Sequence, residues 1–231
     1  MPLSRYKAVF FDVGGTLLKV HPSVGEVYAR QAAEYGFKGS GEELDIEFRR
    51  QWKEMGGIES LDGQSGPELE KQFWRDLVFK VFEPHGGLES FDDYFERVYD
   101  LFTEKESWRI FEDVAASKIF EKLKERGVVL GIISNWDSRL PKTLENLGLK
   151  DHFDFILAST VVGSAKPNRK IFDEALRLSG VSAHEACHIG DELPTDIAGA
   201  QDSGIDAIWI DRKNRQEKAK VPTIRSFMEL V

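Results

Sequence analysis

Five polar side chains in this sequence are of types that could do chemistry together. They are three carboxylates, one hydroxyl and one ammonium: Asp12, Ser134, Lys166, Asp191 and Asp196. A hard divalent cation such as Mg²⁺ takes oxygen ligands, usually one or two carboxylates with waters and substrate phosphate. A carboxylate can also attack phosphorus and form an aspartyl phosphate. These residues are therefore suited to phosphoryl transfer, provided that the fold brings them together.

Phosphoryl transfer also needs positive charge and hydrogen-bond donors around the equatorial oxygens of the transferred group. The ammonium of Lys166, the hydroxyl of Ser134 and the backbone N–H groups of the glycine turn at residues 13–16 meet that need. Lys166 would in addition offset the negative charge of the crowded carboxylates.

The elements that would position these residues alternate between strand and helix. Short apolar runs predict strands at residues 7–11, 128–133, 155–158, 187–189 and 207–210. Caps and apolar spacing predict helices at residues 113–124, 138–147, 168–178 and 195–201. This alternation with short links indicates βαβ units, hence an α/β fold with a doubly wound parallel sheet. Ligands bind at the carboxyl ends of the strands in such a sheet, where the five residues would meet.

A stretch between the first two strands, residues 22–105, carries helical signals and almost no strand signals. Ser40 and Ser65 each precede a glutamate by three residues, which predicts two capping boxes, and Ser90 predicts a third helix start. About four helices are therefore expected as an insertion. Its tryptophans, Trp52 and Trp74, are interpreted as part of the bundle core rather than as a substrate platform.

The arrangement resembles the haloacid dehalogenase-like (HAD) hydrolase superfamily. Four segments match its motifs in order: FFDVGGTLL at residues 10–18, IISN at 132–135, the Lys166-Pro167 step, and HIGDELPTD at 188–196. The resemblance covers the whole core, and the helical insertion lies where that family places its type-1 cap. It implies a Rossmann-like core of residues 1–18 and 107–231, and an inserted α-helical cap domain of residues 19–106.

The resemblance also implies a role for each site residue. Asp12 would be the nucleophile, and Ser134 and Lys166 would hold the phosphoryl group. The implied metal ligands, for Mg²⁺ as cofactor, are Asp12, the carbonyl of Gly14, Asp191 and Asp196, the last as a ligand or as an anchor for one. The implied substrate-binding residues are Gly15, Thr16, Ser134, Asn135 and Lys166. His188, which precedes the glycine-aspartate pair, is interpreted as a core histidine or a support for the site.

Gly14 departs from the pattern of the family's phosphatases. Those enzymes carry a second aspartate two positions after the nucleophile, which acts as general acid on the leaving oxygen and then as base on water. Glycine has no side chain for this task, and such help is commonly worth ~10²–10⁴-fold in rate. We therefore expect impaired phosphatase chemistry on a small phosphorylated metabolite. Asp137, Glu192 and His21 are candidates for a displaced proton donor, although surface positions are the favoured interpretation for all three.

Two other functions remain open. A 2-haloacid dehalogenase also uses an aspartate nucleophile, and its leaving halide needs no proton, so Gly14 would be harmless. Dehalogenation in this family needs no metal, however, and its members lack the glycine-aspartate pair that this chain has at residues 190–191. The second alternative is a degenerate site in a phosphate-binding regulatory protein. Gly14 supports that hypothesis, and the otherwise intact set of residues opposes it.

Composition narrows the remaining classes of function. The chain has 231 residues and a formal net charge of −9, so nonspecific nucleic-acid binding through a basic face is not expected. No segment predicts a secretion signal or a membrane span, and no membrane partner is expected. The single cysteine excludes an intramolecular disulfide and fits a reducing compartment. A cytoplasmic enzyme is therefore expected, and its oligomeric state is left open.

Overall fold

The computed structural model describes residues 3–64, 66–215 and 219–231. A six-stranded sheet forms its centre, in the order β5-β4-β1-β6-β7-β8. Its strands are β1 (Ala8–Phe11), β4 (Val129–Ser134), β5 (Phe155–Ala158), β6 (Ala186–Gly190), β7 (Asp206–Ile210) and β8 (Thr223–Ile224). Every neighbouring pair is parallel, and the chain winds from β1 to one edge and then to the other. The predicted doubly wound α/β core is therefore confirmed.

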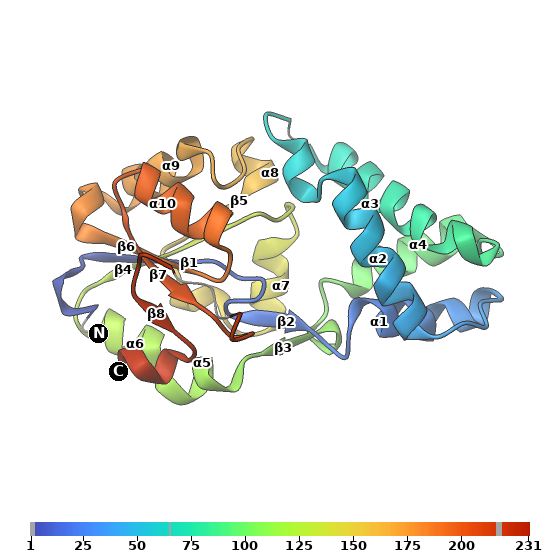
Figure 1. The fold of residues 1–231 in the computed structure, drawn as a ribbon, viewed down its shortest axis with the longest axis horizontal. Helices are drawn as coiled ribbons and strands as arrows, with labels where there is room; N and C mark the ends of the chain where they lie inside the picture. The colour runs from blue at the N-terminus through green and yellow to red at the C-terminus, as the bar shows by residue number, and fades with distance from the viewer. Residues whose placement is uncertain (1–2, 65, 216–218) are drawn as a thin grey trace.

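Helices cover both faces of this sheet (Figure 1). They are α5 (Glu112–Ser117), α6 (Ile119–Lys124), α7 (Leu140–Asn146), α8 (Ser159–Val162), α9 (Arg169–Ser179) and α10 (Ala198–Asp202). Successive side chains of β1 enter different apolar clusters, with Val9 and Phe11 on one face and Ala8 and Phe10 on the other. Burial on both faces explains why this strand is a continuous apolar run rather than an alternating one.

The helical insertion stands beside the sheet, as Figure 1 shows. It consists of α1 (Val24–Ala32), α2 (Gly41–Met55), α3 (Pro67–Phe82) and α4 (Phe91–Leu101), as the sequence predicted. An antiparallel ribbon of β2 (Leu18–Val20) and β3 (Trp108–Ile110) joins it to the core. This ribbon was not predicted, because three residues per strand are too few to show a period. The expected boundaries at residues 18/19 and 106/107 fall within or beside the ribbon and stay predictions.

The helix starts show which capping signals were informative. The capping box at Ser40 is present, with the Ser40 hydroxyl accepting from the Glu43 N–H and the Glu43 carboxylate accepting from the Ser40 N–H. Ser90 precedes α4 but adopts φ 49° and makes no side-chain cap. Ser65 lies outside the described residues, and α3 begins at Pro67 after Gly66.

The single helix expected over residues 113–124 is wrong. Lys118 adopts a left-handed φ of 52° and divides it into α5 and α6. Asp113 caps neither helix, because its carboxylate accepts hydrogen bonds from Arg212 (3.0 Å) and from the backbone N–H of Phe227 (2.7 Å). Tertiary partners that lie about a hundred residues away in sequence have replaced the local cap.

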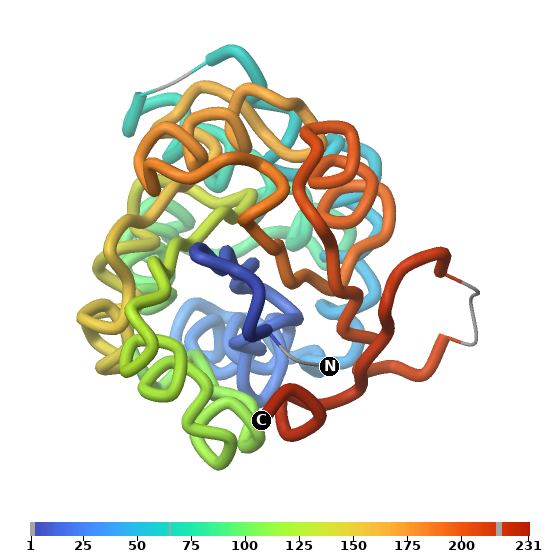
Figure 2. Tube along the Cα trace, turned by 90° about the vertical axis from the view of Figure 1, so that its left-hand side faces the viewer, coloured from blue at the N-terminus to red at the C-terminus, as the bar shows by residue number. Residues whose placement is uncertain are grey.

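Both described ends of the chain lie at the side of the sheet remote from the insertion (Figures 1 and 2), where Leu3 and Val231 line one shallow groove. Among the described helices, none combines the length and the apolar composition that crossing a membrane requires. The opposite side of the sheet, where β1, β4 and β6 end, faces the insertion.

Candidate active site

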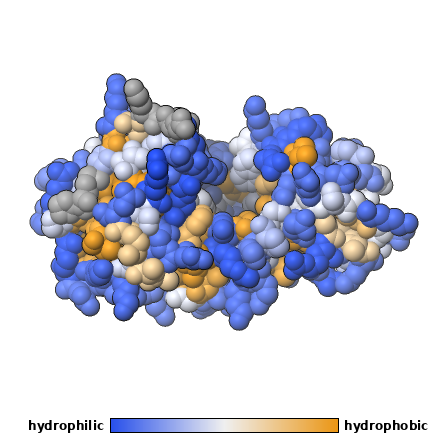
Figure 3. All heavy atoms as spheres, turned by 60° about the horizontal axis from the view of Figure 1, so that its bottom comes forward, coloured by the Kyte–Doolittle hydropathy of each residue, from blue (hydrophilic) through white to orange (hydrophobic). Residues whose placement is uncertain are grey.

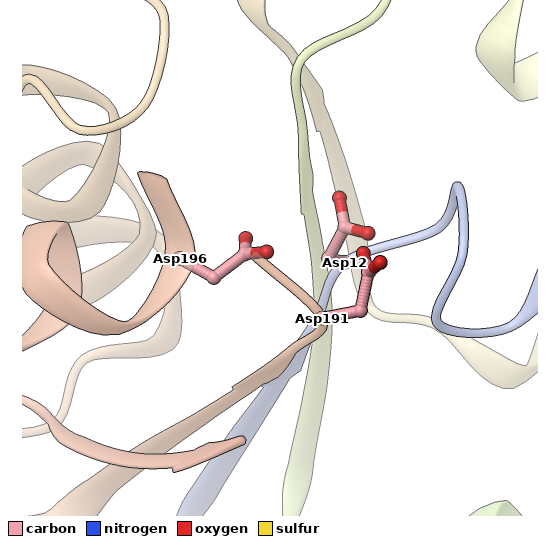
Figure 4. Close-up of side chains that lie close together, drawn as sticks. All are labelled: Asp12, Asp191 and Asp196. Carbon is pink, nitrogen blue, oxygen red and sulfur yellow. The ribbon is translucent and has the colours of Figure 1, made fainter. Parts of the chain in front are cut away.

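Three aspartates converge where β1 and β6 end. Asp12 follows β1, its backbone N–H donates to the Ile189 carbonyl of β6 (2.9 Å), and Asp191 follows β6 directly. One carboxylate oxygen from each of Asp12, Asp191 and Asp196 lies within 4.8 Å of the other two, and all three residues are buried. Figure 4 shows the carboxylates of Asp12 and Asp191 next to each other, with Asp196 reaching toward them from the following helical turn. The structure therefore brings together the carboxylates that the sequence grouped.

Two glycines allow this close approach. A Cβ on Gly190 would lie 2.2 Å from the carboxyl carbon of Asp196, which leaves no room for any side chain. A Cβ on Gly15 would lie 2.6 Å from Asp191 Oδ2, and Gly15 also adopts φ 79°, which L-residues resist. Both motif glycines are thus required by the packing of the carboxylates.

Lys166 is the cation at the centre of the cluster. Its ammonium, 2% exposed, donates to Asp12 Oδ1 (2.7 Å) and to Asp196 Oδ1. Ser134, the last residue of β4, donates its hydroxyl to the same Asp12 oxygen (3.0 Å). Asn135 fixes the lysine loop, because its side chain accepts from the Lys166 N–H (2.7 Å) and donates to the Lys166 carbonyl (3.0 Å). The predicted hydroxyl and ammonium therefore meet at the Asp12 carboxylate.

Asp196 is engaged through both of its oxygens. Besides Lys166, Oδ1 lies 3.0 Å from Nε2 of the fully buried His188, and Oδ2 accepts from the Glu192 N–H (3.0 Å). Such contacts suit a residue that orients Lys166 and the loop after β6. Because both Asp196 oxygens are engaged, Asp12 and Asp191 are the carboxylates of the cluster that could still bind a metal ion.

Burial and crowding of the carboxylates disfavour the ionised forms of Asp12 and Asp191. Burial, with the negative charges of Asp12 and Asp196, raises the pKa of Asp191 to about 8. Burial also raises the pKa of Asp12, although Lys166 opposes this. Burial would raise the pKa of Asp196 too, but Lys166 and His188 outweigh it and hold that pKa below its usual value. The protonated, neutral forms of Asp12 and Asp191 are therefore favoured, and a cation bound between them would favour the ionised forms instead.

The donor set fits a hard divalent cation. Buried carboxylate oxygens on a rigid strand edge are the ligands that Mg²⁺ takes in proteins. Arg215, which the sequence did not single out, supplies part of the compensation by donating to Asp191 Oδ2 (3.2 Å) and to the Asp191 carbonyl (2.9 Å). It belongs to a polar segment near the C-terminus with no motif, so no sequence signal pointed to it.

Gly14 is open to an acidic side chain on steric grounds. Its φ is not in the left-handed region, and the atom nearest to an added Cβ is Cζ3 of Trp136, at an ordinary 3.6 Å. The absence of an acid at this position is thus a property of the sequence and not of the backbone. An aromatic ring faces the space that the acid would use.

The alternative proton donors lie in different surroundings. Asp137 is fully buried, so the surface position expected for it is wrong. Its carboxylate accepts from Trp74 Nε1 (2.7 Å) and pairs with Arg139 (2.7 Å). Glu192 pairs with Arg215 (3.2 Å). Glu192 also lines the cavity that lies between the carboxylates and the helical insertion, whereas His21 is not among the residues that line it.

A cavity of about 350 Å³ opens from the carboxylates toward the helical insertion, and Figure 3 shows a hollow between these two parts. Among the described residues, nine aromatic side chains contribute to its lining: Tyr28, Phe48, Trp52, Trp74, Phe95, Tyr99, Phe102, Trp108 and Trp136. Trp52 and Trp74 thus face the cavity and are not simply bundle core. Thr16, predicted to bind substrate, is absent from the lining; it is fully buried, and its carbonyl accepts from Arg212.

The insertion also reaches the site through residues that sequence reasoning missed. Glu59, on the short 3-10 helix η3 (Ile58–Leu61), lines the cavity and accepts from Asn135 Nδ2 (3.0 Å). Asp62 accepts from the Ala165 N–H (2.7 Å), and Glu70 of α3 accepts from the Ser138 N–H (3.1 Å). The glycines at residues 56–57 and 63 that flank η3 were the available signal, since they mark a loop between two helices.

Comparison with known proteins identifies a family that matches this chain. The haloacid dehalogenase-like hydrolase family matches residues 6–204. Haloacid dehalogenase-like hydrolase domain-containing protein 3 of Mus musculus is 31% identical over 208 residues, which are 89% of this chain and 82% of that protein. Its Homo sapiens counterpart is also 31% identical, over 89% and 82% of the two chains.

Solved structures agree with this match. A 2-haloacid dehalogenase from Pseudomonas syringae pv. Tomato is 27% identical with a TM-score of 0.67, over 97% of this chain and 96% of its own. A HAD phosphatase from Thermococcus onnurineus is 25% identical with a TM-score of 0.67, over 96% and 95%. The similar structures thus include both reaction types, and the predicted family is confirmed. The chain belongs to the haloacid dehalogenase-like hydrolases.

Proposed function

We propose that this hydrolase is a Mg²⁺-dependent phosphatase that acts on a small phosphorylated metabolite through an aspartyl phosphate at Asp12. The observation that carries the proposal is the position of the Asp12 carboxylate. Lys166 and Ser134 both donate to Oδ1, and no described residue donates to Oδ2. One oxygen is thus held in place, and the other is free to attack. The two donors on Oδ1 lie beside the attacking oxygen, where they could turn to the oxygens of a bound phosphoryl group.

The proposed reaction has two steps. An Asp12 oxygen attacks phosphorus, the new O–P bond forms, and the leaving oxygen departs with the electrons of the old P–O bond. Lys166 and Ser134 turn their hydrogen bonds from Asp12 to the phosphoryl oxygens as charge moves onto them. Water then attacks the phosphorus of the aspartyl phosphate and releases inorganic phosphate and the Asp12 carboxylate. With Gly14 in place of an acid, the first leaving oxygen departs without a proton from that position.

Asp12, Asp191 and the Gly14 carbonyl would hold the Mg²⁺ ion, with Asp196 anchoring the loop beside them. When bound, the ion would supply the positive charge that the buried carboxylates lack and that an incoming phosphate dianion needs. The convergence of three buried carboxylates supports this assignment, and a bound cation would favour the ionised form of Asp191, whose pKa is otherwise raised to about 8.

Haloacid dehalogenation is the second candidate. Gly14 and the aromatic cavity favour it, because a halide leaves without a proton and an alkyl halide is apolar. The carboxylate of a 2-haloacid, however, needs a cation. Arg139 lines the cavity, but Asp137 already neutralises it through contacts of 3.0 and 2.7 Å. The phosphatase is therefore the better supported of the two.

A direct assay separates these functions. Phosphate release from acetyl phosphate and chloride release from 2-chloropropionate are measured with Mg²⁺ and with a chelator. We expect Mg²⁺-dependent phosphate release, which Asp12→Asn abolishes and Asp191→Ala loses together with Mg²⁺ binding. Chloride release that persists in the chelator would instead identify a dehalogenase. Binding of Mg²⁺ and phosphate without turnover of either compound would identify a regulatory protein.

The cytoplasm is the compartment that we propose, because the single cysteine fits a reducing environment. Small phosphorylated metabolites are available there. With a net charge of −9, neither a nucleic acid nor an anionic membrane surface is a proposed partner.

A further inference from the structure

We propose that the aromatic cavity binds an uncharged, apolar aromatic group attached directly to the reacting phosphate, so that the substrate class is an aryl phosphate without further charge. The inference rests on the proposed phosphatase function and adds the identity of the leaving group. Three features of the described residues carry it: the chemistry of the cavity wall, the state of the cavity's charged groups, and the residue at position 14.

The aromatic wall begins beside the reacting carboxylate. Gly14 is two residues from Asp12, and a Cβ on Gly14 would lie 3.6 Å from Trp136 Cζ3. The Trp136 ring packs against the Trp108 ring, with centroids 5.0 Å apart. Farther toward the insertion, the rings of Trp52 and Trp74 lie 5.7 Å apart. A group attached to the phosphate oxygen therefore passes from the carboxylates directly onto aromatic surface.

The charged groups of the cavity beyond the aspartate cluster do not suit a charged substrate. The Arg139 guanidinium donates to both Asp137 oxygens and to the Tyr99 carbonyl, and it stacks 3.7 Å from the centroid of the Tyr99 ring. Three of its five N–H groups and one face are thus engaged, and Asp137 already balances its charge. Glu59 would repel an anion, and Lys19 is exposed, with its ammonium over the ring of Phe111. A second phosphate or a carboxylate would enter this space without a free buried partner, at a high desolvation cost.

The third feature is the residue at position 14, which affects how the leaving group departs. The P–O bond that breaks leaves its electrons on the substrate oxygen, and Gly14 donates no proton to it. A phenoxide disperses that charge into its ring and needs little protonation, whereas an alkoxide needs much. The cavity that accepts aromatic rings and the site that lacks an acid therefore select the same leaving group by independent means.

Binding tests the cavity without any turnover. Benzylphosphonate and methylphosphonate share a phosphorus–carbon bond that a phosphatase does not cleave, and they differ only in the ring. We expect calorimetry with Mg²⁺ present to show about 10- to 100-fold tighter binding of benzylphosphonate, as burial of one ring predicts. Four of the five tryptophans line the cavity, so benzylphosphonate should also change the intrinsic fluorescence more than methylphosphonate.

Matched variants locate the effect. Trp52→Leu should reduce the advantage of benzylphosphonate several-fold, and continued binding of methylphosphonate would show that the variant is folded. Phe79→Ala serves as the control, because Phe79 is an exposed aromatic residue of α3 outside the cavity lining. It should leave the ratio of the two affinities unchanged. An equal affinity for the two phosphonates in the unmodified protein would overturn the inference.

Turnover tests the substrate class with leaving groups of similar acidity. 4-Propylphenyl phosphate and phosphotyrosine are both aryl phosphates, and only phosphotyrosine carries a charged tail. We expect kcat/KM to be higher for the propyl compound by about 10-fold or more, because the charged tail would be desolvated without a partner. A higher value for phosphotyrosine would overturn the inference.

The two proposals fail in distinguishable ways. Hydrolysis of acetyl phosphate that depends on Asp12, without any preference between the phosphonates, would remove the aromatic subsite and keep the phosphatase. A preference for benzylphosphonate in a protein that hydrolyses no phosphate would remove the phosphatase and keep the apolar binding site.

Discussion

In the proposed reaction, the residue two positions after Asp12 determines which leaving groups the site can expel. Gly14 has no proton to give, and the structure shows an ordinary backbone and a 3.6 Å contact to Trp136 at this position. The backbone would therefore accept a Cβ at this position. The site thus lacks a proton donor at this position because of the residue type, and a single substitution can test the effect.

We expect Gly14→Asp to accelerate alkyl phosphate hydrolysis up to ~10²-fold, because it restores an acid beside the leaving oxygen. Aryl phosphate hydrolysis should gain much less, since phenoxide leaves unaided. Steady-state kinetics on a sugar phosphate and on 4-nitrophenyl phosphate measures both effects, and Gly14→Asn controls for the added volume. Equal gains on the two substrates, or a wild type that hydrolyses both equally fast, would mean that another residue already supplies the proton.

In the proposed metal site, Asp191 would make Mg²⁺ binding depend on pH. Its pKa is raised from 3.8 to about 8, so folded Asp191 keeps a proton in that interval while the unfolded chain has lost it. The metal-free protein should therefore lose stability as pH rises from about 4 to about 8. Mg²⁺ binding near pH 7 should release a proton, and its affinity should increase with pH until about 8 and then level off.

Calorimetry at about pH 7 in two buffers of different ionisation enthalpy measures this proton release, which should vanish at about pH 9. Asp191→Asn is the control, because it removes the titrating group. Mg²⁺ affinity that is constant from about pH 6 to 9 would show that Asp191 is already ionised in the metal-free protein.

Single residues could be predicted where a motif linked them to a strand end. Asp12, Ser134, Lys166 and Asp191 were grouped because parallel strands share one carboxyl edge, and they do meet there. Arg215 belongs to no motif, and its contact with Asp191 arises only from the path of the C-terminal segment. Tertiary placement of this kind leaves no periodic trace in the sequence.

Among the elements of the helical insertion, η3 contacts a residue of the candidate site directly. Glu59 accepts from Asn135, whose other contacts hold the Lys166 loop. The segment is only four residues long, yet it bridges the two parts of the molecule at the catalytic edge. Its side chains should therefore influence substrate affinity more than stability.

Glu59→Ala should raise KM about 5-fold with a smaller effect on kcat, because one hydrogen bond contributes about 1 kcal/mol. Glu59→Gln keeps an acceptor oxygen for Asn135 and should behave nearly as the wild type. Steady-state kinetics on one aryl phosphate compares the two variants. If Glu59→Gln loses kcat as strongly as Glu59→Ala, Glu59 is a proton donor and not a positioning residue.

The elements were predictable in proportion to their length and burial. The buried core strands were predicted because they are apolar throughout, whereas β2, β3 and β8 have only two or three residues each. The break at Lys118 was missed because a lysine at φ 52° carries no sequence signal. The missing cap at Asp113 has a tertiary cause, because its carboxylate accepts from Arg212.

At the scale of the whole molecule, an ion pair between the buried Asp137 and the 15% exposed Arg139 joins the core to the insertion. Asp137 and Arg139 lie at the start of α7 in the core, and they contact Trp74 Nε1 of α3 and the Tyr99 carbonyl of α4. The positions of the four helices could be predicted from the sequence, but the side of each helix that packs against the core could not. That orientation depends on these long-range contacts.

Asp137→Asn should lower the free energy of unfolding by about 2–4 kcal/mol, because it leaves the largely buried Arg139 without its counter-charge. Glu145→Gln is the control: it removes an exposed pair with Lys142, and such pairs contribute about 1 kcal/mol or less. Urea denaturation of both variants measures the difference. A loss of less than about 1 kcal/mol for Asp137→Asn would mean that this pair does not hold the two parts together.

The central claim is that Asp12 becomes phosphorylated, and chemical trapping tests it most directly. The protein is mixed with Mg²⁺ and acetyl phosphate, quenched in acid and treated with borohydride, which reduces an aspartyl phosphate to homoserine. Peptide mass spectrometry then locates the change. We predict homoserine at position 12 alone, and none in Asp12→Asn or without Mg²⁺. Phosphate release from the unmodified protein with no reduction at position 12 would contradict the proposed mechanism.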